Sequence, residues 1–224
     1  RSQYQDGSGS GIFGQRFNAA GEKLGGEFQV NTNFIGNQYN PTVATLAGGD
    51  FVVVWSDESD ASVRGQRYTA GGAPVGGEFV VNTPDFPSNQ EQYPQISALG
   101  NGGFVVAWDA YYNATVGEYY NVWAQQFDGA GNKVDGPLLL SDDAAYNQMY
   151  PAITGLTGGG FVAAWANSQL DQPGVGDYGV YQRLFGTAGA TERPVSPQLL
   201  DLESYAEFAE NVVNAAPQLL DPGL

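Results

Sequence analysis

The chain has 224 residues, of which 24 are acidic and 8 basic, so its formal net charge is −16, and it contains neither cysteine nor histidine. The negative charge disfavours nucleic-acid phosphates and anionic membrane surfaces as partners, and the missing residue types exclude disulfides, thiolate–zinc sites and imidazole catalysis. We therefore expect no nucleic-acid partner. No segment reaches the ~18 apolar residues of a membrane span, so we expect no membrane insertion either.

The repeat pattern predicts that residue 1 lies in the middle of a repeated unit. Residues 12–17 have the composition of a strand, turn through 18–21, and lead to a second strand at 27–32. We therefore expect half of a four-stranded unit, a half blade, over residues 11–32. An unpaired sheet edge is usually covered, so association into a homo-oligomer through the open half blade is one expected arrangement.

Three apolar runs then follow, at residues 51–55, 104–108 and 161–165. Each has the pattern Phe-Val-x-x-Trp, and the tryptophans at 55, 108 and 165 are 53 and 57 residues apart. A strand that is apolar on both faces is buried on both faces, so we expect these strands to be innermost in their units. A period near 50 residues indicates a modular repeat fold.

Every apolar run has partner strands on both sides in the sequence. A strand opened by proline precedes it across a glycine-rich turn, at residues 41–46, 94–99 and 151–156. Third strands are expected at 63–68, 122–127 and 180–185, and fourth strands at 78–83, 137–142 and 197–201. Gln38, Gln92 and Gln148 stand just before the first strands, where we expect them to hydrogen-bond between neighbouring units.

Four antiparallel strands copied at this period predict an all-β fold, a β-propeller-like array of four-stranded repeats. A β-trefoil and an open repeat array are the alternatives. The repeat domain would span residues 1–201, with blades at 41–83, 94–142 and 151–201, and residues 202–224 would form a covering tail or the start of a following domain. The expected core aromatics are Trp55, Trp108, Trp165, Phe17, Tyr68, Phe127 and Phe185.

The repeats differ most at the insertion over residues 111–121, and loops that depart from a repeat often carry function. We expect the loops at 109–121 and 167–178 to form a contact surface, since aromatic faces beside amides and carboxylates suit sugars or protein surfaces. The candidate ligand-binding residues are Tyr111, Tyr112, Asn113, Tyr119, Tyr120 and Tyr178.

Acidic residues gather in the loops that follow the apolar runs. Ca²⁺ takes six to eight oxygen ligands, so Asp57, Asp60, Asp171 and Asp177 are candidate calcium ligands, and solvated surface charge is the other interpretation. No other cofactor is expected. Paired carboxylates are also compatible with a glycosidase. Arginines could bind the substrate of such an enzyme, but Arg16 and Arg67 occupy equivalent repeat positions, which indicates a structural role for both.

Three strings, at residues 4–17, 25–32 and 102–108, resemble the blade-like repeats of large secreted bacterial proteins of the repeats-in-toxin kind, which are adhesin-like and calcium-associated. Residues 208–218 resemble the entry to a cadherin-like domain. The resemblance implies type I export, an extracellular or cell-surface location and a role in adhesion or display. The family's Gly-Gly-x-Gly-x-Asp calcium repeats are absent here, and no catalytic residue of such repeats can be mapped onto this chain.

The sequence therefore predicts a non-catalytic extracellular binding or structural module of a secreted or surface bacterial protein, with a protein or glycan partner. The alternatives are a glycosidase-like propeller and a calcium-stabilised lectin.

Overall fold

The computed structural model describes residues 2–3, 8–82, 88–114, 117–141, 147–168 and 179–186. The regular secondary structure of these residues is β-strand, apart from the single 3-10 turn Ala47–Gly49. The strands are β1 (Ser2–Gln3), β2 (Ser10–Gly11), β3 (Phe13–Phe17), β4 (Lys23–Gln29), β5 (Gln38–Thr45), β6 (Phe51–Asp57), β7 (Ser62–Tyr68), β8 (Pro74–Val80), β9 (Ser88–Ala98), β10 (Phe104–Ala114), β11 (Gly117–Phe127), β12 (Lys133–Leu139), β13 (Gln148–Gly155), β14 (Phe161–Asn167) and β15 (Gly179–Phe185).

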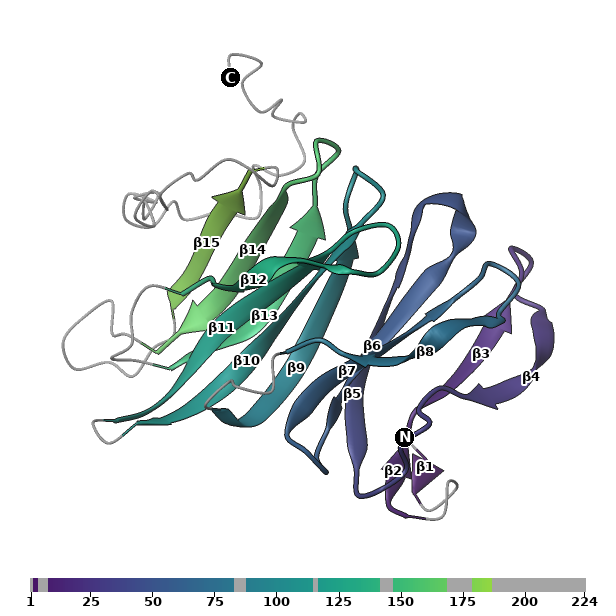
Figure 1. The fold of residues 1–224 in the computed structure, drawn as a ribbon, viewed down its shortest axis with the longest axis horizontal. Coiled ribbons are helices and arrows are strands. Elements are labelled where there is room, and N and C mark those ends of the chain that lie inside the picture. Colours follow the sequence, from purple (N-terminus) through teal and green to yellow (C-terminus); the bar gives the residue numbers. More distant parts are fainter. Residues whose placement is uncertain are drawn as a thin grey trace, which may run out of the picture. The chain divides into compact units, whose positions relative to one another are not determined.

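The strands form successive antiparallel sheets in chain order (Figure 1). Sheet 1 pairs β3 with β4, sheet 2 has the order β5-β6-β7-β8, sheet 3 has the order β9-β10-β11-β12, and sheet 4 has the order β13-β14-β15. Strands β1 and β2 pair with each other just before β3. The predicted all-β architecture of repeated antiparallel sheets, with four strands in sheets 2 and 3, is confirmed.

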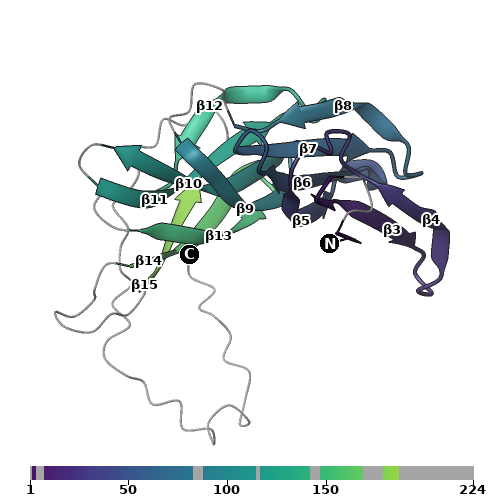
Figure 2. The same cartoon turned by 90° about the horizontal axis from the view of Figure 1, so that it is seen from below.

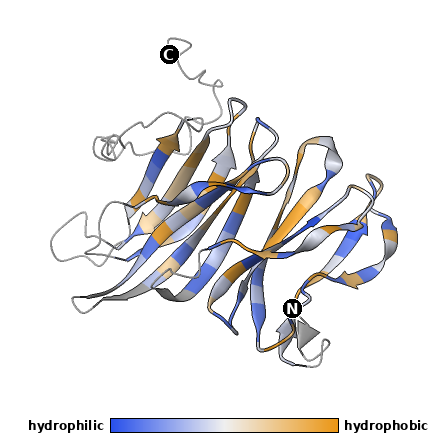
Figure 3. Cartoon of the chain, in the orientation of Figure 1, coloured by the Kyte–Doolittle hydropathy of each residue, from blue (hydrophilic) through white to orange (hydrophobic). Residues whose placement is uncertain are grey.

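The Phe-Val-x-x-Trp segments supply β6, β10 and β14, which are central strands with a neighbour on each side. The two faces of β6 are buried against different sheets: Val52 and Val54 pack toward sheet 3, whereas Val53 and Trp55 pack toward sheet 1. In β14 only the face of Phe161, Ala163 and Trp165 belongs to a core, and the other face is half-buried. The apolar character of these strands is visible in Figure 3. The three tryptophans are at most 3% exposed, so their predicted place in the core is confirmed.

The Phe-Val-x-x-Trp strands are not innermost, contrary to the prediction. The first strands contact one another, β5 with β9 and β9 with β13, and the second and third strands of a sheet contact the first strand of the next sheet, as β6 does with β9 and β10 with β13. Figure 2 shows β5, β9 and β13 gathered together, with β8 and β12 farther out. The Gly155 N–H donates to Ser97 Oγ at 2.8 Å, and a Cβ on Gly155 would run into the Ala98 carbonyl oxygen. An apolar strand needs cover on both faces and both edges, which a second strand has and an edge strand lacks.

The first strands begin before their prolines and pass through a repeated β-bulge. The residue immediately before each proline has a positive φ, at 52° for Asn40, 49° for Tyr93 and 58° for Tyr150. The strand register shifts beside each of these residues. A bulge leaves one residue outside the ladder, which accommodates a proline without an N–H. The fourth strands predicted at 78–83 and 137–142 begin earlier, at Pro74 and Lys133, directly after their turns. The strand predicted at 197–201 and the tail predicted at 202–224 lie outside the described residues.

The polar residues before the bulge are buried, and one was misassigned. Register places Gln38, Glu91 and Gln148 opposite Asp57, Ala110 and Asn167, so the second member of the series is Glu91 and not Gln92. The Gln38 carboxamide oxygen accepts from Asn31 Nδ2 at 3.1 Å, in the link between sheets 1 and 2. The Gln148 oxygen instead accepts from the indole N–H of Trp165 in its own sheet, at 2.7 Å.

One arginine links sheet 1 to sheet 2 and another links sheet 2 to sheet 3, which confirms the structural role predicted for them. Arg16 of sheet 1 donates to the carbonyl oxygens of Gly71 and Ala70 in the β7–β8 turn. Arg67 of sheet 2 donates in the same way to Ala130 and Gly129 in the β11–β12 turn. A forked guanidinium can hold two carbonyl oxygens at once, so each turn is fixed at two points.

One aromatic residue predicted in the core lies outside it. Phe17 is 56% exposed, whereas its equivalents Tyr68 and Phe127 are 4% and 2% exposed. Tyr68 stacks on Phe51, with ring centroids 5.0 Å apart, and Phe127 stacks on Phe104 at 4.6 Å. Phe17 is exposed because no strand with the Phe-Val-x-x-Trp pattern pairs with β3 in the described part of the chain.

Glycine and phenylalanine are matched across β7 and β8. Gly65 lies opposite Phe79, and a Cβ on Gly65 would lie 2.6 Å from Cζ of the Phe79 ring. In sheet 3 the equivalent pair is Ala124 and Leu138. The larger residue on one strand thus goes with the smaller residue on the other, as close packing requires.

We predict that Gly65→Ala destabilises the protein by about 1–2 kcal/mol through overpacking, and that Phe79→Leu in the same chain removes part of this cost. The double variant, which copies the natural pair of sheet 3, should be more stable than the sum of the single effects by at least ~0.5 kcal/mol. Urea unfolding measures all three. Gly77→Ala is the matched control, because a Cβ there meets no atom within 4 Å; additive effects would contradict the packing argument.

Candidate functional site

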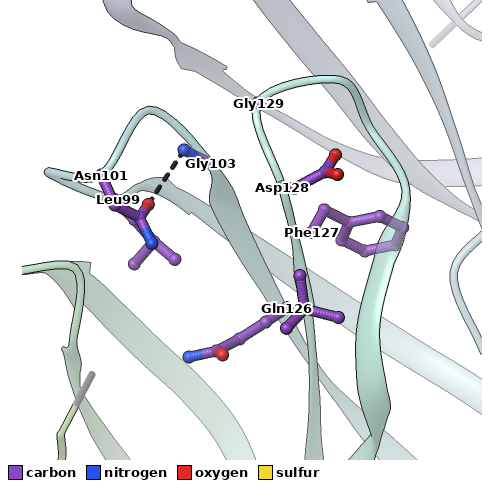
Figure 4. A pocket seen from close by; sticks show the side chains of 8 residues that line it. Leu99, Asn101, Gly103, Gln126, Phe127, Asp128 and Gly129 are labelled. Carbon is purple, nitrogen blue, oxygen red and sulfur yellow. Dashed lines mark hydrogen bonds between the residues drawn. The ribbon is translucent and has the colours of Figure 1, made fainter. Parts of the chain in front are cut away.

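The two ends of sheet 3 have different chemistry. At one end, the Leu99–Gly103 turn and the residues that follow Phe127 enclose a hollow of about 90 Å³ (Figure 4). The turn is closed locally by a hydrogen bond from Gly103 N–H to Asn101 Oδ1 at 3.0 Å. Small-molecule sites are typically about 300–1,000 Å³, so this end is too small for a ligand of that class.

Sheet 2 carries an arginine–carboxylate cluster, formed by Asp57, Asp60, Arg64 and Glu78. Arg64 Nε lies 3.1 Å from Asp57 Oδ2, Arg64 Nη1 lies 3.0 Å from Glu78 Oε1, and Arg64 Nη2 pairs with Asp60. Asp57 is only 1% exposed, so the reading of Asp57 as solvated surface charge is wrong.

Protein donors surround the carboxylates of this cluster. Asp57 Oδ1 accepts from the backbone N–H and the hydroxyl of Ser59, and Glu78 Oε2 accepts from the backbone N–H and hydroxyl of Thr32, both at 2.8 Å. Burial alone would lower the pKa of Arg64, but the hydrogen bond and charge of Asp60 and the charges of Glu78 and Asp57 raise it above its usual value. A calcium ion bound by Asp57 and Asp60 would have to displace this guanidinium.

The opposite end of sheet 3 holds a second group of polar residues, built by extension of the β10–β11 hairpin. These strands have 11 residues each, against 7 in β6 and β7. The predicted loop over 111–121 is therefore largely a strand hairpin, with Tyr111 opposite Tyr120 and Tyr112 opposite Tyr119. Its tyrosines and its Val122 fit a strand, because aromatic and β-branched residues favour strands.

Strand alternation decides which of these residues face sheet 4. Val105 and Ala107 of β10 pack into the core shared with sheet 4, so Asp109 and Tyr111 lie on that same face. On β11, Val122 and Ala124 belong to the same core, which places Tyr120 on this face as well. Two strands of sheet 3 thus direct an acid and two tyrosines toward β13.

Two further tyrosines come from the bulges of β9 and β13. Tyr93 and Tyr150 are 39% and 55% exposed, and their rings meet edge to face with centroids 5.2 Å apart. The rings of Tyr111 and Tyr120 lie 5.0 Å apart at 50°. Tyr93, Tyr111, Tyr120, Tyr150 and Asp109 form what we call the tyrosine–aspartate cluster.

Asp109 lies beneath these rings and is 1% exposed. Its Oδ2 accepts a hydrogen bond from the Tyr150 backbone N–H at 3.1 Å. Its Oδ1 is buried and has no hydrogen-bond partner among the described residues. Burial raises the pKa of Asp109 to about 7, and the Tyr150 hydrogen bond offsets this only in part.

The same environment affects the tyrosine hydroxyls. Burial raises the pKa of Tyr120, and the charge of Asp109 and the neighbouring phenols of Tyr93 and Tyr150 raise it further. Tyr120 therefore keeps its proton at neutral pH and can donate a hydrogen bond, as an uncharged phenol does. The cluster combines exposed aromatic surface, phenolic hydroxyls and one buried acceptor.

The sequence-predicted residues divide between the cluster and other places. Tyr111 and Tyr120 belong to the cluster, whereas Tyr119 is half-buried on the opposite face of the hairpin by strand alternation. The structure describes Tyr112 and Asn113 only in the backbone, paired with Tyr119 and Glu118. Tyr178, Asp171 and Asp177 lie outside the described residues.

Sequence reasoning missed Tyr93 and Tyr150 as site residues. Both stand immediately before the proline of a first strand, and the equivalent residue of sheet 2 is Asn40. The exchange of asparagine for tyrosine at this one repeat position was the available signal. The exchange alone did not indicate a site, because the sequence does not show that the bulges place both tyrosine side chains at the same end of sheets 3 and 4.

Comparison with known proteins gives little beyond this geometry. No family model matches the chain, and no curated protein matches it. Among solved structures, an α-L-arabinofuranosidase from Lactobacillus brevis aligns with a TM-score of 0.42 and 13% sequence identity, over 66% of this chain and 49% of that one. The alignment thus spans about half of that enzyme's length.

We predict that Asp109→Asn removes a pH-dependent loss of stability. The pKa of Asp109 is higher in the folded state than the ~3.9 of an unfolded chain, so folding favours the protonated acid, and stability falls as pH rises from about 4 through 7. Relative to the variant, the parent should lose on the order of 3 kcal/mol across this window.

The measurement is urea unfolding at pH 4.5, 6 and 8. Asp135→Asn removes an exposed carboxylate and serves as the control for the change in net charge. If the free energies of unfolding of the parent, Asp109→Asn and Asp135→Asn all change with pH in the same way, Asp109 does not have the raised pKa of a buried acid.

Proposed function

We propose that the protein is a non-catalytic binding module that contacts a glycan through the tyrosine–aspartate cluster. The observation that carries this proposal is the gathering of four tyrosines from four strands of two adjacent sheets over one buried carboxylate. Sheet 2 has no such group at its own end, since Asn40, Glu58 and Ala61 take the places of Tyr93, Tyr111 and Tyr120. The cluster is therefore an addition to the repeat and not part of its scaffold.

The chemistry of the cluster suits a neutral sugar. Aromatic rings provide apolar faces against which pyranose rings pack, and hydroxyl and carboxylate groups provide the few directed polar contacts of a small-molecule site. A net charge of −16 repels acidic glycans. A protein partner that uses the same aromatic surface is the second candidate.

We further propose that the repeats form a β-propeller-like array. Support comes from meander sheets that stack in chain order, with first strands in contact and fourth strands on the outside. The resemblance to repeats-in-toxin proteins adds the proposal of a secreted or surface bacterial protein that acts in adhesion or display, with calcium as a further stabilising ligand.

A glycosidase remains the competing function. Such an enzyme needs two carboxyl groups about 5–10 Å apart that face one substrate. Glu91 is the buried acid next to Asp109 in the strand register, but it pairs with Ala110, and Ala110 packs toward sheet 2. The two acids therefore lie on opposite faces of sheet 3, which favours binding over hydrolysis.

We expect Tyr93→Asn and Tyr150→Asn to weaken glycan binding without loss of stability. Asparagine is the natural residue of the equivalent bulge at position 40, and it tolerates a positive φ better than tyrosine does. On an array of neutral glycans, the parent should bind and each variant should bind at least tenfold more weakly, which corresponds to ~1.4 kcal/mol.

Val43→Asn is the matched control, because Val43 is an exposed apolar residue, 61% accessible, on the first strand of sheet 2. Full binding by the two tyrosine variants would refute the proposed surface. Turnover of aryl glycosides by the parent, abolished in Asp109→Asn, would establish the enzymatic alternative instead. Binding of a protein in place of any glycan, with the same loss in the variants, would keep the surface and change the partner.

A further inference from the structure

The outer edge of β3 is open within the described part of the chain. In sheet 1, β3 pairs with β4 on one side, and the short strand β1 covers only Ser10 and Gly11 just before it. Residues Phe13–Phe17 have no strand on their other side among the described residues. An exposed edge of this kind presents unpaired backbone groups to an incoming strand.

The backbone groups of that edge can be assigned residue by residue. Ile12 uses its N–H and C=O toward the β4 side, where the N–H donates to Asn31 Oδ1 at 2.7 Å and the C=O accepts from Val30 N–H at 2.8 Å. Because successive residues of a strand point to opposite neighbours, Phe13, Gln15 and Phe17 present their N–H and C=O groups to the open side.

The other sheets show which kind of strand fits this edge. The strands equivalent to β3 are β7, β11 and β15, and they pair with β6, β10 and β14. Each of those partners has the pattern Phe-Val-x-x-Trp. In all three sheets the leading phenylalanine stacks on the last aromatic of the equivalent strand, with centroids 4.6 to 5.0 Å apart.

Phe17 is the equivalent aromatic residue of β3, and no described residue of the chain stacks on it in this way. It occupies the place of Tyr68 and Phe127, yet it is 56% exposed where they are 4% and 2% exposed. A phenylalanine laid opposite it would restore the stack and remove apolar surface from water. The open edge therefore presents both a hydrogen-bonding ladder and an aromatic anchor.

We propose that the β3 edge docks a β-strand with the Phe-Val-x-x-Trp pattern of the chain's own repeats, and that a separate polypeptide supplies this strand. The register follows from sheet 2, where Phe51, Val53 and Trp55 lie opposite Tyr68, Gln66 and Arg64. The docked phenylalanine would lie opposite Phe17, and the docked tryptophan opposite Phe13. This is strand addition to a sheet edge, in which backbone bonds give affinity and alternate side chains give specificity.

The test adds a fluorescent peptide with the sequence of residues 50–58 to the full chain; three of the nine residues of this peptide are acidic, which favours its solubility. Fluorescence anisotropy should show saturable binding. In sheet 2, Val53 points its backbone toward β7 and Val52 points toward β5, as the alternation from Gln66 and Asp50 requires. A Val53→Pro peptide should therefore bind at least tenfold more weakly, whereas a Val52→Pro peptide should bind nearly as well as the parent.

Amide hydrogen exchange then locates the bound peptide. The amides of Phe13, Gln15 and Phe17 should become protected, while those of Gly14 and Arg16, which already face β4, should change little. Absence of binding, equal binding of the two proline peptides, or protection elsewhere on the chain would overturn the proposal. A homodimer that forms through β3 in sedimentation experiments, and that the peptide does not dissociate, would also overturn the proposal. None of these outcomes bears on the tyrosine–aspartate cluster, which lies on other strands.

Discussion

The structure depends on the burial of two Phe-Val-x-x-Trp strands, β6 and β10, on both faces. In β6 and β10 the alternate side chains pack into two different inter-sheet cores, so neither sheet can bury its central strand without a neighbour on each side. Stability in such an array comes from interfaces between repeats as much as from the repeats themselves. The arginine contacts of Arg16 and Arg67 with the next sheet's turn add polar coupling in the same direction.

This constraint explains where the repeats can differ. Facing residues of the third and fourth strands vary together, as Gly65 with Phe79 in sheet 2 and Ala124 with Leu138 in sheet 3. The ends of the sheets are freer, because they lie beyond the shared cores. Sheet 2 uses its end for the Arg64 ion-pair cluster, whereas sheet 3 lengthens its hairpin and gathers tyrosines over a buried carboxylate whose pKa is raised to about 7. A constant scaffold with variable ends is the usual way in which repeat folds acquire binding sites.

The strand types and the buried tryptophans followed from the sequence, because hydrophobic periodicity reports burial directly. The place of the Phe-Val-x-x-Trp strand within its sheet did not, since an apolar run is equally compatible with a second strand and with an innermost strand. Burial of Phe17 was wrongly predicted because it depends on a partner strand and not on the residue itself. Asp57 was expected in solvent, but its partner Arg64 lies across a hairpin. Tyr93 and Tyr150 became site residues through a bulge that local sequence does not reveal.

Amide hydrogen exchange, resolved strand by strand, tests the two-sided burial most directly. If the central strands hold the array together, the amides of β6 and the first half of β10 should exchange only through global unfolding, and those of the outer strands β4 and β12, whose residues are mostly exposed, should exchange through local opening at least tenfold faster. Equal exchange rates in central and outer strands would contradict the account.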